Sequence, residues 1–175
     1  MKIVLIGIQG SGKSTQGNLL SEKLGVPYLS TGHIFRELAK ERTEIGRYIK
    51  ETMSAGYLIP DDKTLEIVDE YLGRKEYESG YILDGFPRTV VQAQSFRENI
   101  NKVVYLRVSD EEALRRLTGQ EDRPDNNSKA IQKRIELFHK LTEPVIDYYR
   151  KKGLLVEVDG EKLIEEVYRE IVKEL

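Results

Sequence analysis

Short apolar runs alternate with helix-patterned stretches along this chain. Five runs are continuously apolar rather than alternating, which is typical of strands that are buried on both faces. They lie at 3–6, 26–29, 81–83, 103–106 and 154–156. Because helical stretches separate the runs, the pattern predicts an α/β fold, a parallel sheet with helices on both faces.

Polar residues predict where several helices begin. SDEE at 109–112 and TVVQ at 89–92 both have the form of a capping box, in which two side chains satisfy N–H groups of the first turn. The stretch 163–171 repeats apolar residues at helical spacing and is expected to pack back on the sheet. One further apolar stripe at helical spacing comprises Ile131, Ile135, Phe138, Leu141 and Val145.

Two regions depart from the strand–helix alternation. The interval 30–80 is too long and too helical in pattern for a loop, so it predicts two or three helices that project as a small subdomain. The interval 118–128 holds Gly, Pro, Asp, Asn and Gln and predicts a mobile loop.

Composition narrows the classes of protein that fit. The chain has 175 residues, which is enough for one domain with a hydrophobic core, and its net charge of −2 gives no general attraction to nucleic acid or anionic membrane. The absence of cysteine excludes disulfides, thiolate zinc sites and a cysteine nucleophile. The first apolar run is too short for a membrane span or a signal peptide, so a cytoplasmic location is expected.

The segment GIQGSGKS at 7–14 fits the phosphate-binding pattern G-x-x-x-x-G-K-[ST] at every fixed position. Its glycines allow the backbone N–H groups to surround phosphate oxygens, Lys13 adds a positive charge, and Ser14 is a candidate beside Mg²⁺. A glycine-rich turn without a ligand is the alternative, and the preceding strand and following helix disfavour it. The ATP-binding residues predicted here are Gly10, Ser11, Gly12, Lys13, Ser14 and Thr15.

A second motif, DGFPRT at 84–89, directly follows the third apolar run. Asp84 stands at a strand end, where a carboxylate can hold waters around Mg²⁺. Arg88 offers a fork that binds phosphate through two N–H groups. A structural ion pair between Asp84 and Arg88 is the alternative interpretation.

With these motifs the chain resembles the nucleoside-monophosphate kinases, and specifically the adenylate kinases, over nearly its whole length. STG at 30–32, AGYLIP at 55–60, GFPRT at 85–89 and VDG at 158–160 carry the resemblance. It implies a P-loop fold in which the five strands lie in the order 2-3-1-4-5.

The resemblance also implies how the chain is divided. Residues 1–175 form a single kinase domain, 30–59 form the subdomain that binds the acceptor nucleoside monophosphate, and 118–128 form a short lid. Many bacterial relatives insert a separate lid domain that often carries zinc. Since this lid is short and the chain has no cysteine, we expect no zinc.

Site roles follow from the resemblance residue by residue. Catalytic roles fall to Lys13, Asp84, Arg88, Arg123 and Arg134. ATP binding adds Arg116 and Lys162 to the phosphate loop. AMP binding falls to Thr31, Arg36, Tyr57, Leu58, Ile59, Gly85, Arg88 and Gln92.

Several of these residues have local explanations when taken singly. Thr31 can cap a helix, Arg36 can be a solvated helix charge, and Gln92 stands at the reciprocal position of the predicted Thr89 cap. Arg134 lies on the apolar face of its helix, where a guanidinium must find an anion or extend outward to water.

The implied activity is reversible phosphoryl transfer from Mg-ATP to AMP, giving two ADP. The acceptor is a phosphate oxygen, so no strong general base is required. The expected cofactor is Mg²⁺ beside Ser14 and Asp84, and the expected partners are ATP, AMP and ADP, with neither nucleic acid nor membrane. A monomer is favoured.

Departures from the family pattern and competing functions remain open at this point. His33, Gln120 and Asn126 differ from usual family residues, and the roles of Arg115 and Arg116 can be exchanged. The alternatives are a UMP/CMP or broad-specificity monophosphate kinase, a nucleotide-dependent assembly factor on the same fold, and a binding module without turnover.

Overall fold

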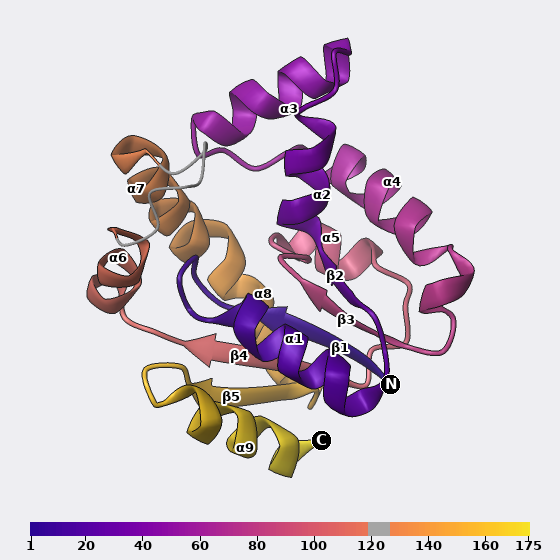
Figure 1. Cartoon of the computed structure of the whole chain (residues 1–175), viewed down its shortest axis with the longest axis vertical. Coiled ribbons are helices and arrows are strands. Elements are labelled where there is room, and N and C mark those ends of the chain that lie inside the picture. The colour runs from indigo at the N-terminus through magenta and orange to yellow at the C-terminus, as the bar shows by residue number, and fades with distance from the viewer. Residues whose placement is uncertain (119–126) are drawn as a thin grey trace.

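The computed structural model describes residues 1–118 and 127–175. Its five-stranded sheet is parallel throughout, in the order β2-β3-β1-β4-β5, which confirms the predicted order (Figure 1). The second strand begins two residues later than predicted, because Pro27 has no N–H to donate and contributes only its carbonyl, to the Ile82 N–H. The strands are β1 (Lys2–Ile6), β2 (Tyr28–Ser30), β3 (Tyr81–Asp84), β4 (Lys102–Arg107) and β5 (Leu155–Asp159).

Helices connect the strands, as the alternating pattern predicts. None of the helices within the described ranges has the length and apolar character needed to cross a membrane. In chain order they are α1 (Lys13–Leu24), α2 (Thr31–Leu38), α3 (Glu44–Ser54), α4 (Asp61–Leu72), the 3-10 turn η1 (Lys75–Tyr77), α5 (Val90–Ser95), α6 (Asp110–Thr118), α7 (Ser128–Leu137), the π-helical turn η2 (Phe138–Thr142), α8 (Glu143–Lys151) and α9 (Ile164–Glu174).

The core lies on both faces of the sheet. Successive residues of a strand point to opposite faces, so Ile3 and Leu5 belong to one cluster while Val4 and Ile6 belong to the other. Helices α1 and α9 cover the first face, and α4, α5 and α8 pack on the second (Figure 1). Strands buried on both sides explain why the apolar runs are continuous.

The long interval after β2 contains three α-helices, which agrees with the predicted two or three. Helices α2 and α3 rise beyond the edge of the sheet at the top of Figure 1. Ser30 caps α2 by accepting a hydrogen bond from the His33 N–H at 3.3 Å, and Thr43 caps α3 by accepting from the Gly46 N–H at 3.0 Å. The interpretation of Thr31 as a helix cap is therefore wrong, because Ser30 holds that position.

The two predicted capping boxes are half confirmed. The Ser109 hydroxyl accepts from the Glu112 N–H, and the Thr89 hydroxyl accepts from the Gln92 N–H. Their reciprocal halves are wrong. The Ser109 N–H donates to Glu161 Oε1 at 2.8 Å, while the Gln92 amide oxygen accepts from the residue before Thr89. Tertiary partners outcompete the local ones at both helix starts.

The apolar stripe predicted near 131–145 is not one regular helix. Ile131, Phe138 and Val145 are buried as expected, but α7 passes through a π-helical turn before α8 begins. Pro144 lacks the N–H that would bind the carbonyl four residues earlier, which favours a wider turn here. In this turn the Thr142 hydroxyl donates to the Arg88 carbonyl at 2.9 Å, so the irregularity joins the helix to the second motif.

Candidate active site

The carboxyl ends of β1 and β3 border a cavity of about 730 Å³, within the range of nucleotide-sized sites. Of the predicted site residues, Arg123 lies outside the described residues, as do Gln120 and Asn126. The predicted residues that line the cavity are Gly10, Ser11, Gly12, Lys13, Ser14, Thr15, Arg36, Tyr57, Leu58, Ile59, Asp84, Gly85, Arg88, Gln92, Arg116, Arg134 and Lys162.

The phosphate loop presents the N-terminus of α1 to this cavity. Gly10 and Gly12 have φ of 89° and 91°, in the left-handed region that glycine adopts without strain. The first helical hydrogen bond runs from the Gln16 N–H to the Gly12 carbonyl, so the N–H groups of the preceding first turn have no helical acceptor. That turn carries no acidic residue and is suited to bind an anion.

Lys13 is folded over the same loop. Its Nζ donates to the Gly7 carbonyl at 2.7 Å and to the Ile8 carbonyl at 2.9 Å. Lys13 is partly buried, and these backbone oxygens hold its ammonium against the loop. Phosphate oxygens are acceptors of the same kind and carry more negative charge.

Asp84 ends β3 and is only 8% exposed. The Tyr28 hydroxyl donates to Asp84 Oδ2 at 2.7 Å, and burial, followed by the Asp84 charge, raises the pKa of Tyr28 so that this hydroxyl stays protonated. Gly17 makes the contact possible, because a Cβ there would lie 2.3 Å from the Tyr28 ring. Asp84 Oδ1 is buried and has no hydrogen-bond partner among the described residues.

These oxygens fit Mg²⁺. A buried carboxylate oxygen without a partner and the Ser14 hydroxyl line one cavity, and Mg²⁺ prefers such hard oxygen ligands. The described part of the chain has no cluster of three or more His, Cys, Asp or Glu residues that could hold a metal by themselves. The residues thus suit an ion held largely by substrate phosphates and water, with one or two protein oxygens.

Arg88 lies over the turn that follows β3. Its Nε donates to the Gly85 carbonyl at 2.7 Å. Gly85 has a φ of 82°, and a Cβ there would lie 2.7 Å from Thr31 Oγ1 and 2.9 Å from Arg88 Nη2. Only glycine lets the hydroxyl and the guanidinium approach this turn together.

Thr31 and Arg36 have different positions at the cavity. Thr31 is 1% exposed, donates to the Asp84 carbonyl at 3.2 Å, and is not part of the cavity lining, so its contact with a nucleotide stays a prediction. Arg36 does line the cavity and crosses Gly32, where a Cβ would lie 3.3 Å from Arg36 Nη1. Two guanidinium groups, Arg36 and Arg88, therefore face the same space.

The Gln92 side chain is 2% exposed and engaged at both ends. Its Oε1 accepts from the Arg88 N–H at 2.7 Å, and its Nε2 donates to Asp61 Oδ1 at 2.8 Å. A backbone N–H requires the amide oxygen and a carboxylate requires the amide nitrogen, so the network admits one orientation of the amide.

Arg134 reaches the cavity from α7. Its Nη1 donates to Gln9 Oε1 at 3.0 Å, and its Nη2 donates to the Met53 carbonyl at 2.9 Å. The alternative of an outward, solvated side chain is wrong, because Arg134 lines the cavity. This one cation joins α7, the phosphate loop and α3.

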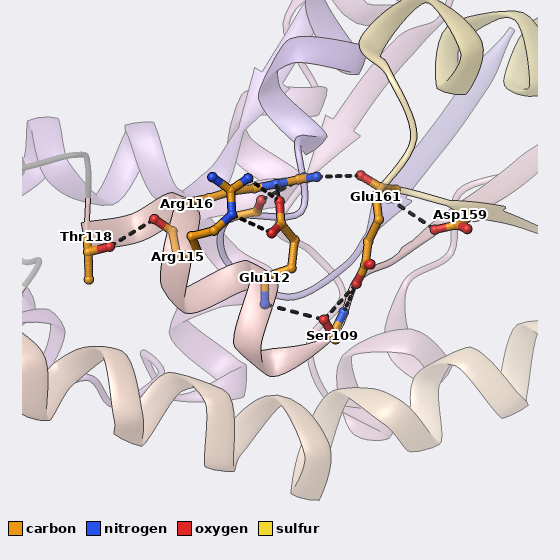
Figure 2. A network of polar contacts seen from close by, with 9 residues as sticks. Ser109, Glu112, Arg115, Arg116, Thr118, Asp159 and Glu161 are labelled. Carbon is orange, nitrogen blue, oxygen red and sulfur yellow. Dashed lines mark hydrogen bonds and ion pairs between the residues drawn. The ribbon is translucent and has the colours of Figure 1, made fainter.

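Arg116 of α6 lies in a network of polar contacts with Glu112 (Figure 2) and also binds the phosphate loop. Its Nη2 donates to the Gly160 carbonyl at 3.0 Å, and Nη1 donates to the Gly10 carbonyl at 3.3 Å. Arg115 and Arg116 both bind Glu112, and these hydrogen bonds, that of Arg115 first, lower the pKa of Glu112 to about 2. Arg115 also lines the cavity but its side chain is 72% exposed, whereas Arg116 binds the loop, so the assignment of the donor-side role to Arg116 stays a prediction.

Lys162 lies at the rim of the cavity, on the segment that follows β5. Its ammonium forms an ion pair with Glu170 of α9, and that hydrogen bond raises the pKa of Lys162. The predicted contact between Lys162 and the donor nucleotide remains a prediction.

Sequence patterns missed four residues that hold this site together: Gln9, Tyr28, Asp61 and Glu112. Gln9 occupies a variable position of the phosphate-loop pattern. Tyr28 and Asp61 bind residues that are 56 and 31 positions away in the chain. The position of Glu112 one helical turn before Arg115 and Arg116 is a local sequence signal for an ion pair. The form of the segment 109–112, however, predicts only a helix cap.

A phosphate loop, a strand-end carboxylate and several guanidinium groups around one cavity define a P-loop phosphotransferase. A family model described as adenylate kinase matches residues 5–154. The chain is 34% identical to an adenylate kinase of Caldicellulosiruptor bescii over all of this chain and 99% of that protein. It is 36% identical to one of Bacillus licheniformis, over 100% and 97% of the two chains, and 37% identical to one of Archaeoglobus fulgidus, over 98% and 96%. The chain belongs to the adenylate kinase family.

The comparison confirms the expected enzyme class, a phosphotransferase that acts on nucleoside monophosphates. The alignment with the Caldicellulosiruptor bescii protein spans 212 positions, whereas this chain has 175 residues. That relative therefore contains residues that this chain lacks.

Proposed function

We propose that this chain transfers the terminal phosphoryl group of Mg-ATP to AMP, reversibly, through the residues that line the cavity. The observation that supports this most is the convergence of two kinds of anion site on one space. The first turn of α1 with Lys13, and the guanidinium groups of Arg36 and Arg88, line one cavity, which Arg134 of α7 also borders.

The donor phosphates bind at the N-terminus of α1. The N–H groups of its first turn and the helix dipole attract them, and Lys13 exchanges its carbonyl acceptors for phosphate oxygens. Arg116 holds the Gly10 and Gly160 carbonyls together and so keeps the loop in shape for the donor. Lys162 and the segment around it border the donor nucleoside.

Ser14 and Asp84 would hold Mg²⁺ beside these phosphates, Asp84 acting directly or through water. The ion, when bound, neutralises charge on the phosphate oxygens and orients them for transfer. The hydrogen bond from Tyr28 occupies Asp84 Oδ2 and leaves Oδ1 as the oxygen for this role.

The acceptor phosphate binds to Arg36 and Arg88. Its attacking oxygen is already anionic near neutral pH, so the site needs positioning and charge stabilisation rather than a general base. Arg134, together with Arg123 outside the described residues, neutralises charge on the phosphoryl group in transit. Gln92 offers an amide to the acceptor base.

The residues 30–59, as the acceptor-binding subdomain, are proposed to close over AMP and exclude water, with 118–128 as the lid for the donor. The segment that follows α3 supplies the far wall through Tyr57, Leu58 and Ile59. Most of the proposed lid lies outside the described residues.

Measurement of nucleoside diphosphate formation from Mg-ATP with AMP, CMP, UMP or GMP tests this proposal. We expect AMP to be strongly preferred, and Arg88→Ala to lower kcat/KM by about 10³-fold, as loss of a phosphate-binding arginine does elsewhere. Arg74→Ala is the matched control, because Arg74 binds Glu70 and Tyr71 and is not part of the cavity lining.

The outcomes separate the parts of the proposal. If CMP or UMP is preferred, the acceptor pocket assigned above is wrong while the phosphotransferase mechanism stands. If no acceptor is phosphorylated and ATP is only hydrolysed, the proposed reaction is wrong. Equal losses of kcat/KM in the Arg88 and Arg74 variants would show that Arg88 has no specific role in the site.

A further inference from the structure

Asp61 lies at the start of α4 and binds two residues at the start of α5, Thr89 and Gln92. Its Oδ1 accepts from Thr89 Oγ1 at 2.9 Å and from Gln92 Nε2 at 2.8 Å. Thr89 in turn accepts from the Gln92 N–H at 3.1 Å. Through these contacts one carboxylate fixes both the side chain of Gln92 and the helix start that carries it.

The orientation of the Gln92 amide matters for recognition of a base. Nε2 has two hydrogens and Oε1 has two lone pairs, and one of each is used by Asp61 and by the Arg88 N–H. The remaining N–H and lone pair belong to a side chain that borders the cavity. They offer one donor and one acceptor in a fixed order.

That order distinguishes two classes of purine. A 6-aminopurine presents an amino donor beside a ring-nitrogen acceptor, whereas a 6-oxopurine presents an oxygen acceptor beside a ring N–H donor. The fixed amide matches the first arrangement or the second, but not both. Turning the amide over would place its oxygen against the Asp61 carboxylate and its nitrogen against the Arg88 N–H, so two hydrogen bonds would be lost.

We propose that Asp61 is a positioning residue that fixes the Gln92 amide and thereby makes the acceptor site select a 6-aminopurine over a 6-oxopurine nucleotide. This inference rests on the proposed function, which assigns the acceptor base to Gln92. Asp61 itself does not touch the substrate. It acts through the hydrogen bond to Gln92 Nε2.

A purely structural role is the competing explanation, since an acid in the first turn stabilises a helix. Asp62 supplies a matched control, because it occupies the same first turn and is exposed. Asp62→Ala removes the same charge from the same helix terminus without touching Gln92. Any effect common to Asp61→Ala and Asp62→Ala therefore reports on helix stability.

The experiment measures kcat/KM for AMP and for inosine monophosphate, with Mg-ATP as donor, in the unmodified chain and in variants. We expect the AMP-to-inosine ratio to fall about tenfold or more in Asp61→Ala, since only the Arg88 N–H then opposes turning the amide over to pair with the 6-oxo edge. Asp61→Asn should keep most of the ratio, because its side-chain oxygen can accept both hydrogen bonds. Asp62→Ala should leave the ratio unchanged.

Thermal unfolding of each variant accompanies the kinetics. If Asp61→Ala does not fold, Asp61→Leu fills the same space without an acceptor and gives the same test. An unchanged ratio in a folded Asp61 variant, with both substrates slowed equally, overturns the proposal and assigns Asp61 a structural role. If Asp61→Asn lowers the AMP-to-inosine ratio as much as Asp61→Ala does, the proposal is overturned too, because the acceptor oxygen would then be irrelevant.

The unmodified chain separates this failure from failure of the proposed function. If it phosphorylates AMP and only the Asp61 variants contradict expectation, the kinase assignment stands without the positioning role. If the unmodified chain phosphorylates neither nucleotide, the proposed function fails and the inference about Asp61 fails with it.

Discussion

At the scale of single residues, the cations of the site are held by backbone oxygens. Lys13 donates to the Gly7 and Ile8 carbonyls, Arg88 to the Gly85 carbonyl, and Arg116 to the Gly160 carbonyl. These carbonyl acceptors fix where the three side chains lie. Arg116 is in addition paired with the Glu112 carboxylate.

Gly85→Ala tests how closely that arrangement depends on one turn. The new Cβ would lie 2.7 Å from Thr31 Oγ1 and 2.9 Å from Arg88 Nη2, so Arg88 must move. We expect KM for AMP to rise about tenfold or more, in steady-state assays, because the guanidinium proposed to bind the acceptor phosphate is displaced.

Gly153→Ala is the control for the backbone effect. Gly153 also has a positive φ, 69°, but a Cβ there would meet nothing within 4 Å. Both variants should lose about 1 kcal/mol of folding free energy, because an L-residue is strained in this region. An equal rise of KM in both variants would show that strain, rather than the position of Arg88, is responsible.

At the scale of elements, the turn between α7 and α8 joins several parts of the site. Arg134 extends from the last turn of α7, Thr142 binds the Arg88 carbonyl, and His139 lies between Asp110 of α6 and Glu143 of α8. His139 Nδ1 is 2.6 Å from Glu143 Oε1, and Nε2 is 2.9 Å from Asp110 Oδ1. Both nitrogens can donate only when the ring is protonated.

This contact predicts a pH dependence of stability. The hydrogen bond to Glu143, and then that to Asp110, raises the pKa of His139 above its usual value of 6.5. A raised pKa in the folded state means that the stabilisation is fully present below about pH 6.5 and is lost as the pH rises through the higher, folded value. Unfolding by urea between about pH 5 and 8 should show this difference between the unmodified chain and His139→Gln.

His33→Gln provides the comparison, because His33 is the other histidine of the chain and is exposed on α2. The stability difference between low and high pH that His139 contributes should persist in this variant. A His139→Gln variant that loses stability equally at every pH, or more at high pH, would contradict the assignment.

Elements were more predictable from the sequence than their contacts. The continuous runs at 3–6 and 103–106 indicate buried strands because burial on both faces leaves no polar position. The order of the strands came from the resemblance, since no local pattern encodes which strands pair. Capping hydroxyls at Ser109 and Thr89 were recognisable, but their reciprocal partners were not, because residues distant in the sequence displace them.

The same limit applies to the site. Motifs pointed to Lys13, which follows β1, and to Asp84 and Arg88, which follow β3, because each motif lies within a single strand–helix unit where residue types recur at a fixed spacing. The hydrogen-bond partners of the site residues come from other elements. Tyr28 of β2 binds Asp84, and Asp61 of α4 binds Gln92. A partner across the fold has no fixed spacing, so only the structure reveals it.

At the scale of the whole molecule, the C-terminal end of α3 lies beside the start of α7 (Figure 1). Arg134 of α7 donates to the Met53 carbonyl, and Asn127 donates to the Ser54 carbonyl at 2.9 Å. A Cβ at Gly56 would lie 2.6 Å from the Ala130 carbonyl, so this glycine permits the close approach. The residues proposed to bind the two phosphates thus line one cavity rather than separate surfaces, which favours transfer between nucleotides over loss to water.

The most direct test of this account follows the terminal phosphoryl group of ATP itself. Mg-ATP labelled at that phosphate is mixed with unlabelled AMP and the chain, and the products are separated by chromatography. The account predicts that the label appears in the outer phosphate of ADP formed from AMP, in step with ATP consumed. Label released as inorganic phosphate while AMP remains unchanged would contradict it.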